Sequence, residues 1–256
     1  MTVDLLMLGV FSFLGGLIDA AVGGGGLILI PALLHALPQH AVATVLGTNK
    51  LAVLLGTGSS ALTFLKRVKI QWRLIIPCLL SAFACAYIGA YSVASIPTHI
   101  MKYLVFVLLV AMAVYTFMRK ELGQVQQEKT LGTFQILQGY FLGGMIGFYD
   151  GAFGPGSGSF FIFMFVRLFG FDFLNAAASS KLLNIGTFIA ALSFFVPSGH
   201  MLWQLGFYIA ACNVMGAIVG TFVALKYGSG LIRKLFLVLL VFLIGRMGMS
   251  ILTAAA

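Results

Sequence analysis

Charged residues are scarce in this chain. Lys, Arg, Asp and Glu make up 8% of its 256 residues, whereas soluble domains carry about a quarter. This scarcity excludes a water-soluble globular domain. Hydrophobic residues make up 61%, and apolar runs of about 20 residues, the length that crosses a hydrocarbon core of about 30 Å, recur along the chain. The composition predicts an all-α polytopic membrane protein.

Other absences narrow the function. The three cysteines all fall within apolar runs, which excludes a disulfide framework and a zinc site. Six acidic residues, only two of them deep in apolar segments, are too few for a cation cage, so we expect no metal and no cofactor. The net charge of +9 comes from basic residues at segment ends, where they face anionic lipid rather than nucleic acid.

The apolar segments form two sets separated by one polar stretch. The first set covers 5–22, 26–37, 41–65, 74–94 and 101–118, and the second covers 132–149, 158–170, 175–197, 204–225 and 231–252. We therefore expect a first membrane repeat at 1–118, a cytoplasmic linker at 119–131 and a second membrane repeat at 132–256. The pattern leaves open whether 26–37 and 158–170 cross the membrane or re-enter.

The two sets resemble each other at a constant offset of 131 residues. The matched pairs are Asp19 with Asp150, Gly23 with Gly154, Gly25 with Gly156, Lys50 with Lys181, and Trp72 with Trp203. Glycine matches are common in such a composition, but coincident Asp, Lys and Trp are not. The offset therefore predicts an internal duplication.

Loop charges predict opposite orientations for the two halves. The loop KRVKIQWR at 66–73 carries four positive charges and should be cytoplasmic, whereas its counterpart PSGHMLWQ at 197–204 has no Lys or Arg. This reversal is typical of inverted-topology repeats. We expect two inverted repeats of about five apolar segments each, in the inner (cytoplasmic) membrane, with both termini outside.

Glycine-rich motifs interrupt one apolar segment in each half. Four glycines at 23–26 follow Asp19, and Gly-Pro-Gly at 154–156 follows Asp150. Such sequences break a helix, and a break at membrane depth must be buried or line a watery cavity. We expect 23–26 and 154–158 to be non-helical and adjacent near the bilayer midplane. Close helix packing is the alternative role for these glycines.

Two lysines lie deep in apolar segments. Lys50 is about nine residues, or about 13 Å of helix, inside its segment, which is too deep for snorkelling to the interface. Lys181 lies about six residues inside its segment. Each lysine follows an aspartate by 31 residues, so we expect Asp19 to pair with Lys50, and Asp150 with Lys181. The aspartates either form structural ion pairs or carry coupled protons.

The breaks and the lysines together predict an anion site. Half-helix N-termini and neutral side-chain donors suit an oxyanion or a carboxylate better than a metal cation. The candidate substrate-binding residues are Gly23, Gly24, Gly25, Asn49, Lys50, Gly154, Gly156, Ser157, Ser180, Lys181 and Asn184.

These motifs resemble the sulfite exporter TauE/SafE family of membrane transporters. The resemblance lies in GLIDAAVGGGGLILIPAL near the start, TNKL at 48–51, GFYDGAFGPGSGSF at 147–160 and SSKLLN at 179–184, and it extends over nearly the whole chain. It implies transport of small organosulfur or C2-type anions, such as sulfite, sulfonates or sulfoacetate. Nothing in the spacing selects one of them.

The sequence therefore favours a secondary transporter and not an enzyme. The expected activity is export of a small anion, with protons as the candidate coupling ion. An anion channel is the alternative. A membrane enzyme is a weaker one, because HExxH, GxSxG and Walker patterns are absent from the sequence. The expected partners are the anion and the lipid bilayer, without nucleic acid. The direction of transport, the coupling ion and a homodimeric state stay open.

Overall fold

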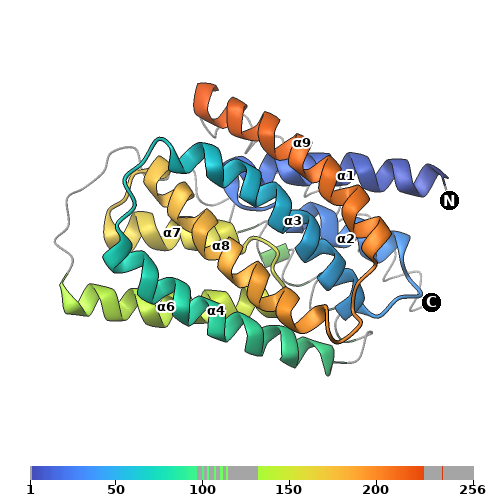
Figure 1. Ribbon diagram of the computed structural model, residues 1–256, viewed down its shortest axis with the longest axis horizontal. Helices are drawn as coiled ribbons and strands as arrows, with labels where there is room; N and C mark the ends of the chain where they lie inside the picture. Colours follow the sequence, from blue (N-terminus) through green and yellow to red (C-terminus); the bar gives the residue numbers. More distant parts are fainter. Residues whose placement is uncertain are drawn as a thin grey trace.

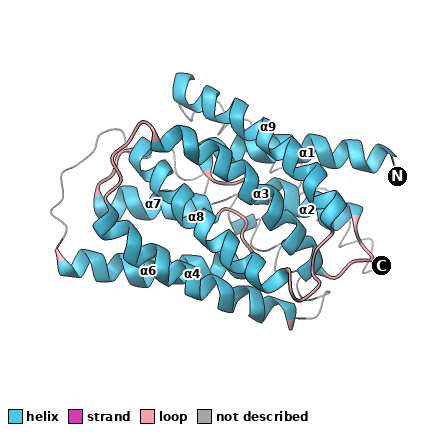
Figure 2. Ribbon diagram, in the orientation of Figure 1, coloured by secondary structure: helices cyan, strands magenta, loops and turns pink. Residues whose placement is uncertain are grey.

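The chain is helical throughout the part that the structure describes. The structure is a computed structural model that describes residues 2–96 and 132–227 continuously, with single positions at 100, 103, 107, 110, 111, 114 and 238. The first range forms α1 (Thr2–Val22), α2 (Gly26–Ala36), α3 (Val42–Leu65) and α4 (Trp72–Ala94). The second range forms α6 (Thr133–Ala152), α7 (Ser157–Phe169), α8 (Phe173–Phe195) and α9 (Trp203–Tyr227). These two ranges contain no strand (Figure 2).

The helix ends follow the apolar segments of the sequence. Each end lies within three residues of the expected boundary, so the all-helical prediction is confirmed for these eight segments. The segments expected at 101–118 and 231–252, and the linker at 119–131, lie outside the continuously described ranges.

The helices of the two halves begin at matching positions. α6, α7, α8 and α9 begin 131 residues after α1, α2, α3 and α4, respectively. Their packing matches as well, since α1 packs on α9 and its counterpart α6 packs on α4. Figure 1 shows α1 and α9 along one edge, α4 and α6 along the opposite edge, and the other four helices between them. Each edge is therefore built from both halves.

Three described helices, α4, α8 and α9, are long and apolar enough to cross a membrane. By contrast, α2 has 11 residues and α7 has 13, which correspond to about 16 and 20 Å of helix. Both are shorter than a hydrocarbon core of about 30 Å. Eight consecutive residues of α2, 27–34, are buried, so this helix is enclosed by protein on all sides.

Two apolar clusters enclose the two short helices. One cluster packs α2 against α1, α3 and α9, and the other packs α7 against α4 and α8. The equivalent short helix of each half therefore occupies the interior, and the chain break that precedes it is held inside the protein.

Both predicted breaks exist, but they are shorter than expected. Helix α1 ends at Val22 and α2 begins at Gly26, while α6 ends at Ala152 and α7 begins at Ser157. Gly23 has φ +73° and Gly154 has φ +90°, a conformation that side chains disfavour. The expectation that Gly26 and residues 157–158 are non-helical was wrong, because small residues fit readily into a first helical turn.

Candidate functional site

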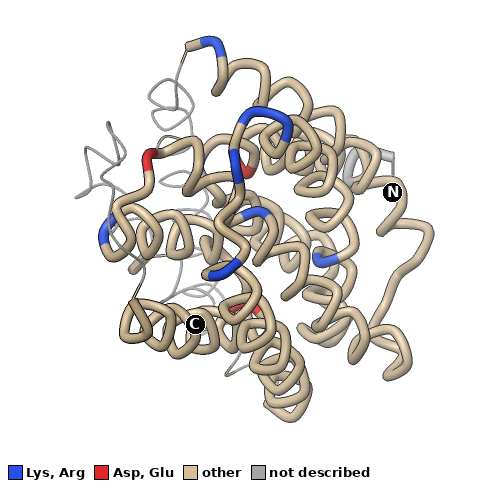
Figure 3. Tube along the Cα trace, turned by 60° about the vertical axis from the view of Figure 1, so that its left-hand side comes forward, with Lys and Arg blue, Asp and Glu red and all other residues tan. Residues whose placement is uncertain are grey.

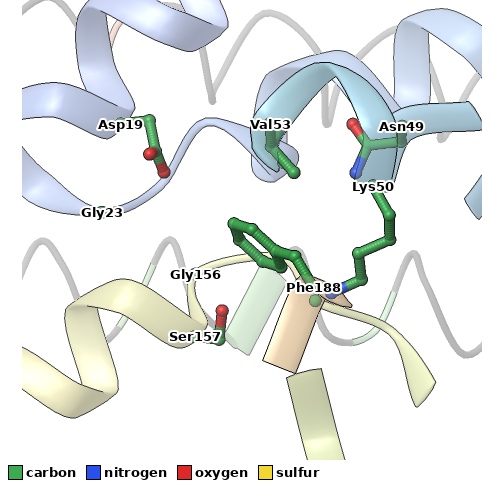
Figure 4. A pocket seen from close by; sticks show the side chains of 10 residues that line it. Asp19, Gly23, Asn49, Lys50, Val53, Gly156, Ser157 and Phe188 are labelled. Carbon is green, nitrogen blue, oxygen red and sulfur yellow. The ribbon is translucent and has the colours of Figure 1, made fainter. Parts of the chain in front are cut away.

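A small cavity lies where the two breaks meet. Its lining comes from both halves and comprises Asp19, Gly23, Gly26, Asn49, Lys50, Val53, Gly154, Gly156, Ser157 and Phe188 (Figure 4). Its volume is about 10 Å³ for the centre of a water-sized sphere, which is room for about one water molecule. The space in this cavity is therefore smaller than an oxyanion.

The first break touches the first turn of α7, directly after the second break. The Ser159 backbone N–H donates to the Gly23 carbonyl oxygen over 3.2 Å, and the Ser180 hydroxyl donates to the Gly158 carbonyl over 2.9 Å. A Cβ atom on Gly23 would lie 2.6 Å from the Gly158 carbonyl carbon, so no side chain fits there. The expected adjacency of the breaks is confirmed, and their depth in the bilayer stays a prediction.

Lys50 forms an ion pair with Asp150 of the other half. Its Nζ atom lies 2.8 Å from Asp150 Oδ1 and 2.5 Å from the Asp150 carbonyl oxygen. The lysine side chain is 1% exposed and the aspartate is completely buried. Because a buried charge without a partner is costly, this pair ties α3 of the first half to the end of α6 in the second.

Hydroxyl groups complete the surroundings of the Asp150 carboxylate. Ser157 Oγ donates to Oδ1 over 2.8 Å, and the Thr187 hydroxyl donates to Oδ2. Gly154 closes over the ion pair, since a Cβ atom on it would lie 2.9 Å from Lys50 Nζ. The carboxylate is thus anchored by three side chains, and the glycine lets the backbone approach them.

The second lysine also reaches across the halves, but it meets the main chain. Lys181 Nζ donates to the Asp19 carbonyl oxygen over 3.2 Å and lies 5.2 Å from the centre of the Phe64 ring. The Asp19 carboxylate instead accepts from the Thr57 hydroxyl over 2.7 Å and from the Gly25 N–H over 3.2 Å. The two lysine environments are therefore chemically different.

The expected pairing within each half was wrong. The sequence spacing of 31 residues fixes where each lysine and aspartate lies in its own half, but not which of them meet. Because α3 packs on α8, each lysine bonds to the aspartate of the other half, Lys50 through the Asp150 carboxylate and Lys181 through the Asp19 carbonyl. Figure 3 shows how few other charged positions the described trace carries.

Seven of the thirteen residues that the sequence singled out line the cavity. These are Asp19, Gly23, Asn49, Lys50, Gly154, Gly156 and Ser157. Asp150, Gly25, Ser180 and Lys181 bond to groups at the breaks without being part of the lining. Gly24 accepts a hydrogen bond from the Leu27 N–H in the first turn of α2, and the amide nitrogen of Asn184 faces Gly158.

Gly26 lines the cavity, although the sequence had assigned it to the break and not to the binding residues. Four further residues at this site were missed altogether. Thr57 and Thr187 hold the two carboxylates, while Val53 and Phe188 line the cavity. A signal existed for the threonines: each is a hydroxyl residue six or seven positions after a deep lysine, about two helical turns along α3 or α8. Val53 and Phe188 had no such signal in a chain with 24 phenylalanines.

Comparison with known proteins identifies the family of this chain. The family model of the sulfite exporter TauE/SafE matches residues 8–247. No solved structure matches the chain.

Three relatives have descriptions as probable membrane transporter proteins. One from a Sinorhizobium species is 37% identical, over 91% of this chain and 88% of its own length. Another, from Haemophilus influenzae, is 35% identical, over 93% and 92%. The protein YfcA from Escherichia coli K12 is 32% identical, over 92% and 87%. The chain belongs to the TauE/SafE family of membrane transporters.

Proposed function

We propose that this member of the TauE/SafE family is a secondary transporter that exports a small anion, such as sulfite, a sulfonate or a related organosulfur compound. The observation that carries this proposal is the cavity between the two breaks. It brings a lysine ammonium together with the first turns of two half-helices, whose N–H groups and dipoles favour negative charge.

Alternating access accounts for the small size of the cavity. A space for about one water molecule is too small for an oxyanion. The anion therefore enters when the site opens to one side of the membrane and leaves when it opens to the other. This arrangement is typical of transporters built from inverted repeats around broken helices. An open anion channel would need a continuous water-filled path wide enough for the anion, and the described residues leave room for only about one water molecule here.

The charges near the cavity support proton coupling. Lys50, Lys181, Asp19 and Asp150 are all buried, and their formal charges sum to zero. A bound monoanion adds a negative charge in a medium of low dielectric constant, and a proton on one carboxylate restores neutrality. Asp19 fits that role better than Asp150 because it lines the cavity and has Thr57, Gly25 and the nearby Lys181 as its polar neighbours.

Flux in proteoliposomes tests this function. Purified protein should carry sulfite down its gradient, and a pH gradient across the vesicle should change the initial rate several-fold. Asp19→Asn should keep downhill sulfite flux but lose its response to the pH gradient, because the proton-accepting carboxylate is gone. Vesicles that contain the wild-type protein but show no more sulfite flux than empty vesicles would contradict the proposal.

The inverted orientation of the halves has its own test. It is supported by the matched helix starts, the exchanged packing of α1 on α9 and α6 on α4, and the reversed loop charges. Single cysteines at Lys69 and His200, in a background lacking the three natural cysteines, should react with an impermeant reagent from opposite sides of the membrane. Equal labelling of both positions from one side would refute it.

A further inference from the structure

Phe188 lies against the Lys50 ammonium, beside its ion pair with Asp150. An ammonium has three N–H donors, and Asp150 accepts two of them through Oδ1 and its carbonyl oxygen. The centre of the Phe188 ring lies 4.6 Å from Lys50 Nζ, within cation–π distance. Figure 4 shows this ring in the middle of the space between Asp19, Val53 and Ser157.

We propose that Phe188 determines the specificity of this site. Its ring moves off Lys50 to admit the anion, and in the loaded state it limits the size of the organic group that the anion carries. This inference rests on the proposed anion transport. It adds to that proposal the residue that selects small anions over larger sulfonates.

The Phe188 ring is the lining group that an approaching anion displaces at the lowest cost in free energy. A cation–π contact is weaker than a buried, hydrogen-bonded ion pair, so displacing Phe188 costs less than separating Lys50 from Asp150. The glycines in the lining are fixed by backbone contacts between the breaks. In the open state of the transporter, rotation of the Phe188 side chain would enlarge the cavity while these glycines keep their contacts.

Phe64 provides a matched control. Its ring lies over the second lysine, with Lys181 Nζ 5.2 Å from its centre, and it is as buried as Phe188, at 1% against 4% exposure. It packs in the apolar cluster around α7 and is not part of the cavity lining. Truncating Phe64 therefore removes a comparable ring without enlarging the cavity.

Binding of a size series tests the inference. Sodium sulfite, methanesulfonate and propanesulfonate are titrated by calorimetry into the detergent-purified full chain as wild type, Phe188→Ala, Phe188→Leu and Phe64→Ala. Wild type and Phe64→Ala should prefer sulfite. In Phe188→Ala, the ratio of the propanesulfonate Kd to the sulfite Kd should fall by about tenfold or more, because room for methylene groups changes discrimination by about that much.

Phe188→Leu retains more of the side-chain volume and replaces Phe188→Ala in the test if the alanine variant does not fold. Its ratio of the propanesulfonate Kd to the sulfite Kd should also fall, but by less. An unchanged ratio in a folded Phe188 variant, while sulfite still binds, would overturn the role of Phe188 and leave anion transport standing. An equal fall in Phe64→Ala would also overturn it. Absence of binding by all three anions in every protein would overturn the anion site itself, and this inference with it.

Discussion

Replacing Lys50 with methionine is expected to abolish anion transport. The substitution removes the ammonium that lines the cavity and leaves the Asp150 carboxylate buried without its ion-pair partner. Removing one member of such a pair costs about 3–5 kcal/mol, so the single variant should also unfold at lower temperature in detergent. Loss of flux in this variant alone therefore does not separate function from stability.

The double variant Lys50→Met with Asp150→Asn separates the two effects. A neutral pair leaves no isolated charge, and neutral replacements of buried ion pairs are often tolerated. In the wild type Ser157 and Thr187 donate to different oxygens of Asp150. The asparagine amide keeps one oxygen that accepts from one of these hydroxyls, and its N–H can donate to the other. We expect thermal stability near that of the wild type with flux no greater than in empty vesicles. Restored stability with wild-type flux would show that the pair is structural only.

Replacing Gly23 with alanine is expected to have the largest effect on folding of any change in the glycine run. Gly23 has φ +73°, which costs an alanine about 1–2 kcal/mol. Its new Cβ would also lie 2.6 Å from the Gly158 carbonyl carbon and 2.9 Å from the Ser159 nitrogen. Because both are backbone atoms, the contact between the two breaks must open.

Gly26→Ala is the matched control within the same four glycines. A Cβ at Gly26 would have its nearest contacts at 3.6 Å, to Ile30 and Pro155, which is ordinary van der Waals contact. Alanine is also a better helix former than glycine. We expect Gly26→Ala to purify and melt like the wild type, and Gly23→Ala to give little folded protein by size-exclusion chromatography. Equal behaviour of both variants would contradict the close contact at Gly23.

The sequence contained enough information to predict the helices and the breaks. Apolar length predicted each described helix within three residues. The helix-breaking run that follows Asp19 and the Gly-Pro-Gly that follows Asp150 predicted the two interruptions. These features are local, because hydropathy and glycine composition act on the segment that contains them.

The sequence could not predict which lysine meets which aspartate, because these contacts depend on how the two halves pack. Lys50 lies on α3 and Asp150 lies on α6, 100 residues along the chain, and both of these helices pack on α8. The same holds for Phe188, which reaches the first-half lysine from α8. The four consecutive glycines were also indistinguishable in the sequence, although the structure gives Gly23 and Gly26 different conformations and neighbours.

The position of a bound anion tests the central claim most directly. Selenite has the shape and charge of sulfite and carries an anomalous scatterer, so diffraction from crystals soaked in selenite locates it. The account predicts one peak between the two breaks, within hydrogen-bond distance of Lys50 Nζ, and no peak there in the Lys50→Met Asp150→Asn protein. A peak at another place in crystals of a transport-competent protein, or a peak that survives the double substitution, would contradict it.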